Sequence, residues 1–323
     1  MKKLGSSIAA IGLTLALFVT PASAQVKVIA GGPGNDQIQP YVDQYLGIWD
    51  KYGLKIDFEG QNWLRAAQRM ASGDFDAGYI SFASAIRYRA AGMPVVIVGT
   101  SSANCTTLVS SPSIKSVADL KGKKIGIVAK FDVDYMVFTR MVLPRYGLSV
   151  KDVELVSSPS TDIAGAILTG SLAAAYTFEP YGTFAIQKGA KRLLPGSEWI
   201  DKSKINTELF RSALIMKEQF IKEHPDLAKK IVWAHMDAMH VLKNEPENGM
   251  KVLQHYNDKM DPELIKAAYA TCSWNYSIVP QAWIEMLAKW EKEDKIVERD
   301  VGYKEITDFS MRDSYPGYPA WKK

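Results

Sequence analysis

The sequence predicts an α/β fold made of two similar lobes, each a βαβ-based sheet with flanking helices. Three observations lead to this prediction. Short apolar runs alternate with stretches of helical periodicity, as in parallel α/β sheets. Much of the first such unit matches a second one further along the chain. The 323 residues, 47% hydrophobic and 23% charged, have the composition of a globular protein long enough for two domains.

The first unit covers residues 26–99. Apolar runs at 26–30, 54–58, 75–80 and 95–99 predict strands, and residues at helical spacing predict helices at 38–49, 62–71 and 81–91. Gly53 and Gly73 follow two of these helices, where glycine commonly ends a helix. The unit therefore has the order βαβαβαβ.

A shift of 97 residues lays a second unit over the first. Residues 72–79 align with 169–176, residues 28–30 with 125–127, and Gly92 with Gly189. Any two βα units share periodicity, so one match could arise by chance. Several matches at one offset favour two equivalent lobes, whose corresponding strand ends face each other.

The chain crosses twice between the lobes, at the strands expected over 105–109 and 212–216. Helices follow at 227–243, 246–256, 262–270 and 280–293, each entered near a proline, and residues 303–323 are expected to form an extended surface segment. We therefore predict the first part of lobe 1 at 25–103, lobe 2 at 104–210, and the return to lobe 1 with C-terminal helices at 211–323.

Residues 1–24 have the pattern of a secretory signal peptide. Lys2 and Lys3 precede an apolar run at 8–19, and Ala22-Ser23-Ala24 fits a cleavage site after Ala24. The apolar run is too short to span a bilayer. No cysteine follows it, which argues against a lipid anchor. For a bacterial protein the pattern predicts a soluble mature chain in the periplasm.

Charge and cysteine content exclude several classes of function. The formal net charge of +4 becomes +2 without Lys2 and Lys3, and the basic residues are scattered among acids, so no nucleic-acid partner is expected. Cys105 and Cys272 are the two cysteines. Two buried free thiols are the simpler interpretation, although a disulfide would persist outside the cytoplasm. Their spacing predicts no metal site.

The sequence lacks the usual motifs of enzymes. It contains no Gly-x-Ser-x-Gly elbow, phosphate loop or dinucleotide fingerprint, and the four histidines all lie in the C-terminal helical region. We expect no catalytic activity, no cofactor and no metal. Glu179 could be considered a general acid, but no partner for it is evident.

Four segments carry a family resemblance: residues 83–94, 116–127, 146–155 and 174–181, with Ala118-Asp-Leu-Lys-Gly-Lys-Lys124 and Glu179-Pro-Tyr181 the most specific. Together they resemble the periplasmic solute-binding proteins of nitrate/sulfonate/taurine-type ABC importers, which are grouped with thiamine-pyrimidine binding proteins. The likeness covers about residues 26–231. It implies a type II two-lobed fold with a ligand cleft between the lobes, hinge closure, and delivery of a small solute to an ABC permease in the inner membrane, but not which solute is bound. We also expect the protein to be a monomer.

The resemblance also implies which segments line the cleft. Four edges line it: the loop after the first strand, the end of the third strand, the loop before the first helix of lobe 2, and the end of the strand at 174–178. Trp63 lies separately, where the second strand leads into its helix. The ligand-binding candidates are Asn35, Gln37, Trp63, Tyr79, Ser81, Phe82, Phe131, Asp132, Tyr135, Tyr176, Phe178 and Glu179.

One departure from the family pattern bears on ligand charge. Members that take oxyanions tend to offer small hydroxylated residues and free N–H groups at this helix start, whereas here Asp132 and Asp134 stand there. Asp132 could simply be a helix N-cap, which would still consume donors that an anion needs. With the aromatic candidates and Glu179, the pattern favours an amine or N-heterocycle over a sulfonate, while Lys130 could hold a carboxylate.

Three alternatives stay open at this point. The same fold includes an enzyme branch that makes the thiamine pyrimidine, but a cysteine-rich motif expected there is absent from this sequence. It also includes effector domains of transcription regulators, which would follow a helix-turn-helix where this chain has its signal-like segment. A sensor subunit that presents ligand to a membrane receptor is the third.

Overall fold

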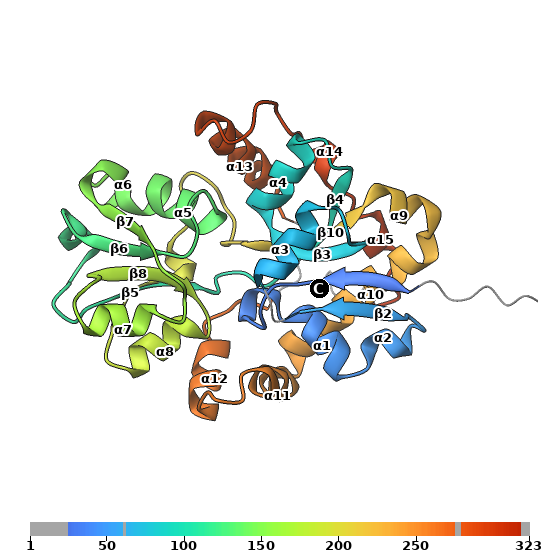
Figure 1. Ribbon diagram of the computed structural model, residues 1–323, viewed down its shortest axis with the longest axis horizontal. Helices are drawn as coiled ribbons and strands as arrows, with labels where there is room; N and C mark the ends of the chain where they lie inside the picture. Colours follow the sequence, from blue (N-terminus) through green and yellow to red (C-terminus); the bar gives the residue numbers. More distant parts are fainter. Residues whose placement is uncertain (1–24, 61–62, 275–278, 318–323) are drawn as a thin grey trace, which may run out of the picture.

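The computed structural model describes residues 25–60, 63–274 and 279–317, with the side chains of residues 63 and 64 left out. It contains two five-stranded sheets, each with flanking helices (Figure 1). The sheets form two lobes joined near the middle of the molecule. The predicted two-lobed α/β fold is thus confirmed. The predicted signal peptide lies outside the described residues.

The first sheet has the strand order β2-β1-β3-β10-β4. Its strands are β1 (Val26–Ile29), β2 (Ile56–Glu59), β3 (Ala77–Ser81), β4 (Val95–Thr100) and β10 (Ser212–Lys217). The strand β10 runs antiparallel to both neighbours, whereas β1, β2 and β3 are parallel. The chain therefore returns to this lobe by inserting one antiparallel strand.

The second sheet has the equivalent order β7-β6-β8-β5-β9. Its strands are β5 (Thr106–Ser110), β6 (Lys124–Ile127), β7 (Glu154–Ser157), β8 (Ala174–Phe178) and β9 (Lys191–Pro195). Here β5, the strand that enters the lobe, is the antiparallel member. Since β3 and β8 occupy the same sheet position and begin 97 residues apart, the topology confirms the predicted repeat.

The helices follow the predicted periodicity closely. In the first lobe they are α1 (Gln39–Tyr45), α2 (Ile48–Lys51), α3 (Trp63–Ala71) and α4 (Phe82–Ala90); in the second, α5 (Val133–Val137), a π-helical turn (Phe138–Val142), α6 (Leu143–Arg145), α7 (Ile163–Leu168) and α8 (Tyr181–Gln187). The single helix expected at 38–49 is split, because Gly47 adopts a left-handed conformation with φ of 65°.

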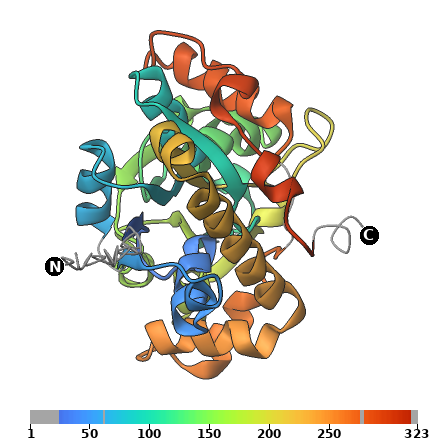
Figure 2. The same ribbon diagram turned by 90° about the vertical axis from the view of Figure 1, so that its right-hand side faces the viewer.

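After β10, every described element of the C-terminal region is a helix. The region contains α9 (Glu218–Glu223), the long α10 (Pro225–Asn244), α11 (Pro246–Tyr256), α12 (Pro262–Tyr269), α13 (Gln281–Glu293), α14 (Tyr303–Ile306) and α15 (Ser310–Asp313). Figure 2 shows α10 running across the first lobe. The prediction of an extended segment from residue 303 is wrong for residues 303–313, because this stretch contains the two short helices α14 and α15. Within the described ranges, no helix combines the length and apolarity required to cross a bilayer.

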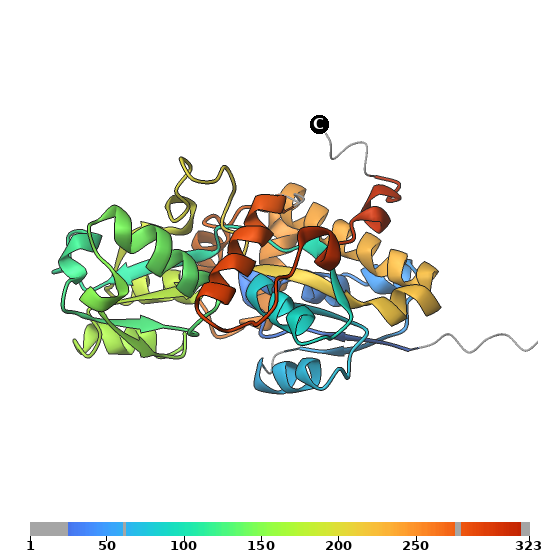
Figure 3. The ribbon, with the colours of Figure 1, turned by 90° about the horizontal axis from the view of Figure 1, so that it is seen from above.

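Two C-terminal helices touch both lobes. Helix α12 packs against α8, and α13 packs against α4 of the first lobe and α5 of the second. Figure 3 shows α13 lying across the junction. Trp283 and Leu287 of α13 belong to one apolar cluster that continues from Phe82 in the first lobe to Phe138 in the second. The C-terminal helices therefore stabilise the relative placement of the lobes.

A disulfide joins Cys105 to Cys272. Cys105 directly precedes β5 at the first crossing, and Cys272 follows α12. The interpretation of two free thiols is therefore wrong. Sequence spacing could not reveal the pair, because 167 residues separate the two cysteines. The bond ties the crossing to the C-terminal helices.

We expect reduction of this disulfide to lower the free energy of unfolding by about 2–4 kcal/mol, since an open loop of this length regains conformational entropy in the unfolded chain. Urea unfolding with and without reductant measures the difference. The variant Cys105→Ser/Cys272→Ser should match the reduced protein and show no response to reductant. A reductant effect of equal size in that variant would contradict the assignment.

Candidate ligand site between the lobes

Arg211 lies at the centre of a buried charged cluster between the two lobes. It immediately precedes β10, and its backbone carbonyl accepts a hydrogen bond from the Phe82 N–H at 3.0 Å. Its Nη1 donates to Asp36, its Nη2 to Asp132 at 3.2 Å, and its Nε to Asp134 at 2.8 Å. All four side chains are 10% exposed or less. One guanidinium thus holds three carboxylates from both lobes.

Local structure fixes each carboxylate. Asp36 lies in a 3-10 turn after β1, where Ser212 Oγ donates to its Oδ2 at 3.0 Å. Asp132 is the N-cap of α5 and accepts from the Val133 N–H at 2.9 Å. Asp134, in the first turn of α5, accepts from Thr106 Oγ1 at 2.9 Å. The predicted N-cap at Asp132 is confirmed, and acids in a first helical turn also suit the helix dipole.

The cluster carries more negative than positive charge. Burial is the largest influence on Asp134 and, with Asp132 nearby, raises its pKa to about 6 although Arg211 opposes the shift. Burial alone would lower the pKa of Arg211, but the three aspartates together raise it. The guanidinium also lies over the Phe178 ring, 5.0 Å from its centroid. Arg211 therefore stays charged, and the excess charge is negative.

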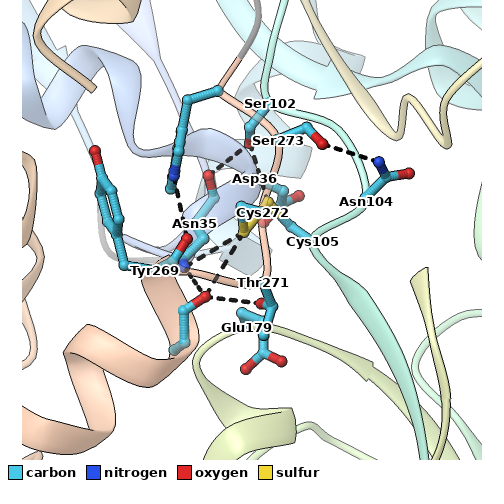
Figure 4. The surroundings of a disulfide bond; sticks show 12 residues. Asn35, Asp36, Ser102, Asn104, Cys105, Glu179, Tyr269, Thr271, Cys272 and Ser273 are labelled. Atoms are coloured by element: carbon cyan, nitrogen blue, oxygen red, sulfur yellow. Dashed lines mark hydrogen bonds between the residues drawn. A yellow bond between two sulfur atoms is a disulfide. The ribbon is translucent and has the colours of Figure 1, made fainter. Parts of the chain in front are cut away.

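A backbone hydrogen bond joins the two lobes beside this cluster. The Asn35 N–H of the first lobe donates to the Glu179 carbonyl of the second at 3.0 Å, and the Glu179 N–H donates to the Cys105 carbonyl at 2.8 Å. A side chain on Gly34 would come within 3.3 Å of the Phe178 ring, so glycine permits this approach. Figure 4 shows Asn35, Asp36 and Glu179 gathered around the disulfide.

The Glu179 side chain is fully buried and only partly satisfied. Its Oε2 accepts from the Thr183 N–H of α8 at 2.9 Å, while its Oε1 lies 3.7 Å from Arg192 Nη2 without a hydrogen bond. Burial raises the pKa of Glu179. Asn35 Oδ1 is a second buried acceptor without a partner among the described residues. Such spare acceptors suit a molecule that donates hydrogen bonds.

The loop before α5 forms another edge of the junction. Phe131 has a left-handed backbone with φ of 61°, and its carbonyl accepts from Arg87 Nη1 of α4 at 3.0 Å. Its ring lies 5.3 Å from the Tyr135 ring, and Lys130 Nζ lies 4.8 Å from its centroid. The rings of Phe131 and Tyr135 therefore lie on the side of the lobe junction that α5 and its preceding loop form.

Several predicted residues gather at the lobe junction: Asn35, Phe131, Asp132, Tyr135, Phe178 and Glu179. Two more support it from behind. Gln37 Nε2 donates to Ser212 Oγ at 3.3 Å, and Ser212 in turn binds Asp36. Ser81 caps α4, accepting from the Ser84 N–H at 3.2 Å.

Other predicted residues lie in the cores of the lobes. Tyr79 packs inside the first lobe, with its hydroxyl 2.9 Å from His235 Nδ1. Tyr176 packs against Phe138 and Trp199 in the second lobe, and Phe82 is fully buried in the shared apolar cluster. Trp63 begins α3, and its side chain lies outside the described part. Position at a strand end alone does not distinguish a residue facing the junction from one facing the core.

Sequence reasoning missed Arg211 and Asp36. Both carried a usable signal. Asp36 stands between the predicted Asn35 and Gln37, and Arg211 immediately precedes the strand at the predicted second crossing. A cation at the crossing, set against acids at two equivalent loops, could have been recognised as an interlobe contact.

Replacing Arg211 by Met should lower the free energy of unfolding by about 3–5 kcal/mol, because three buried carboxylates would lose their common cation. Arg140→Met is the matched control. Arg140 is 26% exposed and pairs with Glu293 and Asp294 near the surface, so its loss should cost at most about 1 kcal/mol. Urea unfolding measures both. Equal, small costs for the two variants would contradict the role given to Arg211.

The Asp134 carboxyl should make stability depend on pH. Its pKa is about 6 in the folded protein and near the ordinary 3.8 when unfolded, so the folded state binds this proton more tightly. Its contribution is full below pH 4 and is lost as the pH rises through 6, up to about 3 kcal/mol. Asp134→Asn should remove this slope in urea unfolding between pH 4 and 7. Parallel slopes for the variant and the wild-type protein would refute it.

Comparison with known proteins agrees with the fold. A Brucella abortus (strain 2308) protein, provisionally named a binding protein, is 26% identical over 210 residues, which is 64% of this chain and only 63% of the Brucella protein. The 4-amino-5-hydroxymethyl-2-methylpyrimidine phosphate synthase of Schizosaccharomyces pombe is 24% identical over 276 residues, 80% of this chain and 78% of the synthase.

Solved structures with the same fold include two binding proteins. The ligand-binding component of an ABC-type import system from Staphylococcus aureus matches with a TM-score of 0.77 and 13% identity over 90% of this chain and 99% of its own. The periplasmic aliphatic sulphonate binding protein of Escherichia coli matches with a TM-score of 0.71 and 17% identity over 87% and 91%. The sequence model described as NMT1/THI5 like matches residues 35–249, more than half of the chain. This chain therefore belongs to the NMT1/THI5-like family.

Proposed function

We propose that this protein is the solute-binding component of an ABC importer and that its solute is a small organic cation, an amine or N-heterocycle. One observation carries the choice of charge: three buried carboxylates converge on a single guanidinium between the lobes. A positively charged ligand group would offset the remaining negative charge. A sulfonate would add to it.

The state of Arg211 supports a cation further. Each of its three nitrogens already donates to a different aspartate. An oxyanion would have to displace a buried carboxylate to reach the guanidinium, which costs an ion pair in a poorly solvated place. A cation needs only to share carboxylate oxygens, which accept several hydrogen bonds each.

Ligand selection would also use the neighbouring groups. Asn35 Oδ1 and Glu179 Oε1 are buried acceptors without a hydrogen-bond donor among the described residues, although Arg192 lies 3.7 Å from Glu179 Oε1. The Phe131 and Tyr135 rings come from the same loop and helix as Asp132. Nitrogen heterocycles and aromatic amines provide N–H donors on a flat surface that can pack against rings. Ligand contacts present only in the closed form would then favour closure of the lobes.

The importer role is supported by the fold shared with the Staphylococcus aureus import component and the Escherichia coli periplasmic protein. It requires export of the chain into the periplasm through the predicted signal peptide at 1–24, action as a monomer, and docking to a membrane permease. A sensor subunit would use the same site and differ only in its membrane partner.

The Schizosaccharomyces pombe relative keeps an enzymatic alternative open. A synthase would need reactive side chains at the ligand, but both cysteines of this chain are engaged in the disulfide. Incubation with a bound solute and mass analysis separates the two roles. A binding protein returns the solute unchanged, whereas an enzyme returns a product.

Amines and N-heterocycles should raise the melting temperature, because they bind only the folded protein. A thermal-shift panel of amines, N-heterocycles, carboxylates and sulfonates tests this, with native mass spectrometry of freshly purified protein for retained solute. Asp132→Asn should weaken binding of a cationic hit by about tenfold or more, since charged hydrogen bonds contribute about 1.5–3 kcal/mol. A panel in which only sulfonates or carboxylates bind would overturn the cation assignment.

A further inference from the structure

Glu291 is an acid at a core position of α13. Trp283, Leu287 and Glu291 follow one another at intervals of four residues, so they share one face of the helix. All three are 0% exposed, and the first two anchor α13 in the apolar cluster that spans both lobes. A carboxylate on this buried face needs an explanation, because burial of a charge is costly unless it is paired and hydrogen-bonded.

The surroundings of Glu291 leave its carboxylate incompletely satisfied. Arg87 Nη1 lies 3.7 Å from Glu291 Oε1, too far for a hydrogen bond, and neither Glu291 oxygen has a hydrogen-bond partner among the described residues. Arg87 instead donates to the Phe131 carbonyl at 3.0 Å and to Ser84 Oγ at 2.9 Å. If the pair of Arg87 and Glu291 served only to stabilise the fold, the Arg87 N–H groups would be expected to donate to the Glu291 carboxylate.

The charges around Glu291 come from three elements. Arg87 belongs to α4, Asp132 caps α5, and Asp294 follows α13. Burial is the main cause that raises the pKa of Glu291 to about 8, Arg87 opposes it, and Asp132 and Asp294 add to it. Arg87 Nη1 lies between Glu291 Oε1, at 3.7 Å, and the Phe131 carbonyl, at 3.0 Å, so the acid lies close to the loop that leads into Asp132.

We propose that Glu291 is a ligand-binding residue of the interlobe site and accepts N–H hydrogen bonds from a protonated nitrogen group, an ammonium or amidinium. This inference rests on the cationic solute proposed above and adds the C-terminal helix α13 to the segments that would bind it. Glu291 lies on the C-terminal helix that touches both lobes, so a ligand held there would join α13 to the loop at Phe131. The unused acceptor oxygens are the groups that such a ligand would satisfy.

Binding of a cation should remove the proton from Glu291. In the ligand-free protein at pH 7, Glu291 is mostly protonated because its pKa is about 8. When a cation binds, the carboxyl O–H bond breaks, the proton passes to buffer, and the carboxylate faces the bound nitrogen group. Binding at pH 7 therefore releases close to one proton. At pH 9 the carboxylate is already formed, so the release should disappear for a ligand that stays protonated at that pH, such as an amidinium.

The test uses benzamidine, benzylamine and 4-aminopyridine as cationic probes and benzenesulfonate as the anionic one, with isothermal titration calorimetry of the full chain in two buffers of different ionisation enthalpy at pH 7. The same titration at pH 9 uses benzamidine, because the two amines lose much of their own charge there. Glu291→Gln should weaken the cationic probes at least tenfold and abolish proton release. Glu285→Gln is the matched control, since Glu285 is exposed on the same helix. It should behave as wild type.

Each outcome bears on a different statement. Cationic probes that bind the wild-type protein and Glu291→Gln equally, with equal proton release, would overturn the role of Glu291 and leave the cationic solute standing. Binding of benzenesulfonate alone, or of no probe, would overturn both.

A purely structural role for Glu291 is tested without ligand. Because the raised pKa makes the charged form unfavourable in the folded protein, wild-type stability should fall as the pH rises through 8. Glu291→Gln should therefore melt at a higher temperature than the wild-type protein at pH 9. A lower melting temperature for the variant at pH 9 would identify a stabilising ion pair with Arg87 and overturn the proposal.

Discussion

The closed arrangement of the two lobes depends on the ion cluster around Arg211. Asp36 comes from the first lobe, Asp132 and Asp134 come from the second, and the arginine stands on the crossing between them. Opening the lobes would separate the guanidinium from at least one carboxylate and expose both to water. Buried ion pairs contribute little to stability on average, because the desolvation of both charges offsets their attraction, but a charge that stays buried without its partner is strongly unfavourable, so the lobes can close only where each carboxylate meets the guanidinium. The cluster therefore favours one relative placement of the lobes over a continuum of others.

The net negative charge of this cluster makes closure of the lobes depend on the charge of the ligand. Because carboxylates outnumber the cation, closing the empty lobes concentrates negative charge, and part of this cost appears as the raised pKa of Asp134. A cationic ligand would relieve it and would bind the closed form more tightly than the open one. Differential affinity of this kind is what a ligand needs to shift a conformational equilibrium. An anionic ligand would act in the opposite direction.

Sequence patterns predicted the architecture well because it follows from local periodicity and from one repeat. The equivalence of β3 and β8 was visible from the alignment of 72–79 with 169–176, and the N-cap at Asp132 from the chemistry of one helix start. The site was predicted less completely. Tyr79 and Tyr176 lie at the expected strand positions, but the pleat turns both side chains into cores. An apolar aromatic ring gives no indication of which face it will occupy.

The missed features all depend on contacts between distant parts of the chain. Cys105 meets Cys272 across 167 residues, and Arg211 meets Asp36 across most of the first and second lobes. Local propensity does not encode such pairs. Glu291 differs: it was not singled out from the sequence, but its spacing of four residues from Leu287 and eight from Trp283 in the predicted helix at 280–293 was a usable local signal. A charged residue at a core position of an amphipathic helix breaks the local pattern, and such breaks tend to occur where function imposes its own requirement. The break in α13 lies where the helix meets both lobes, beside the cluster that holds them closed.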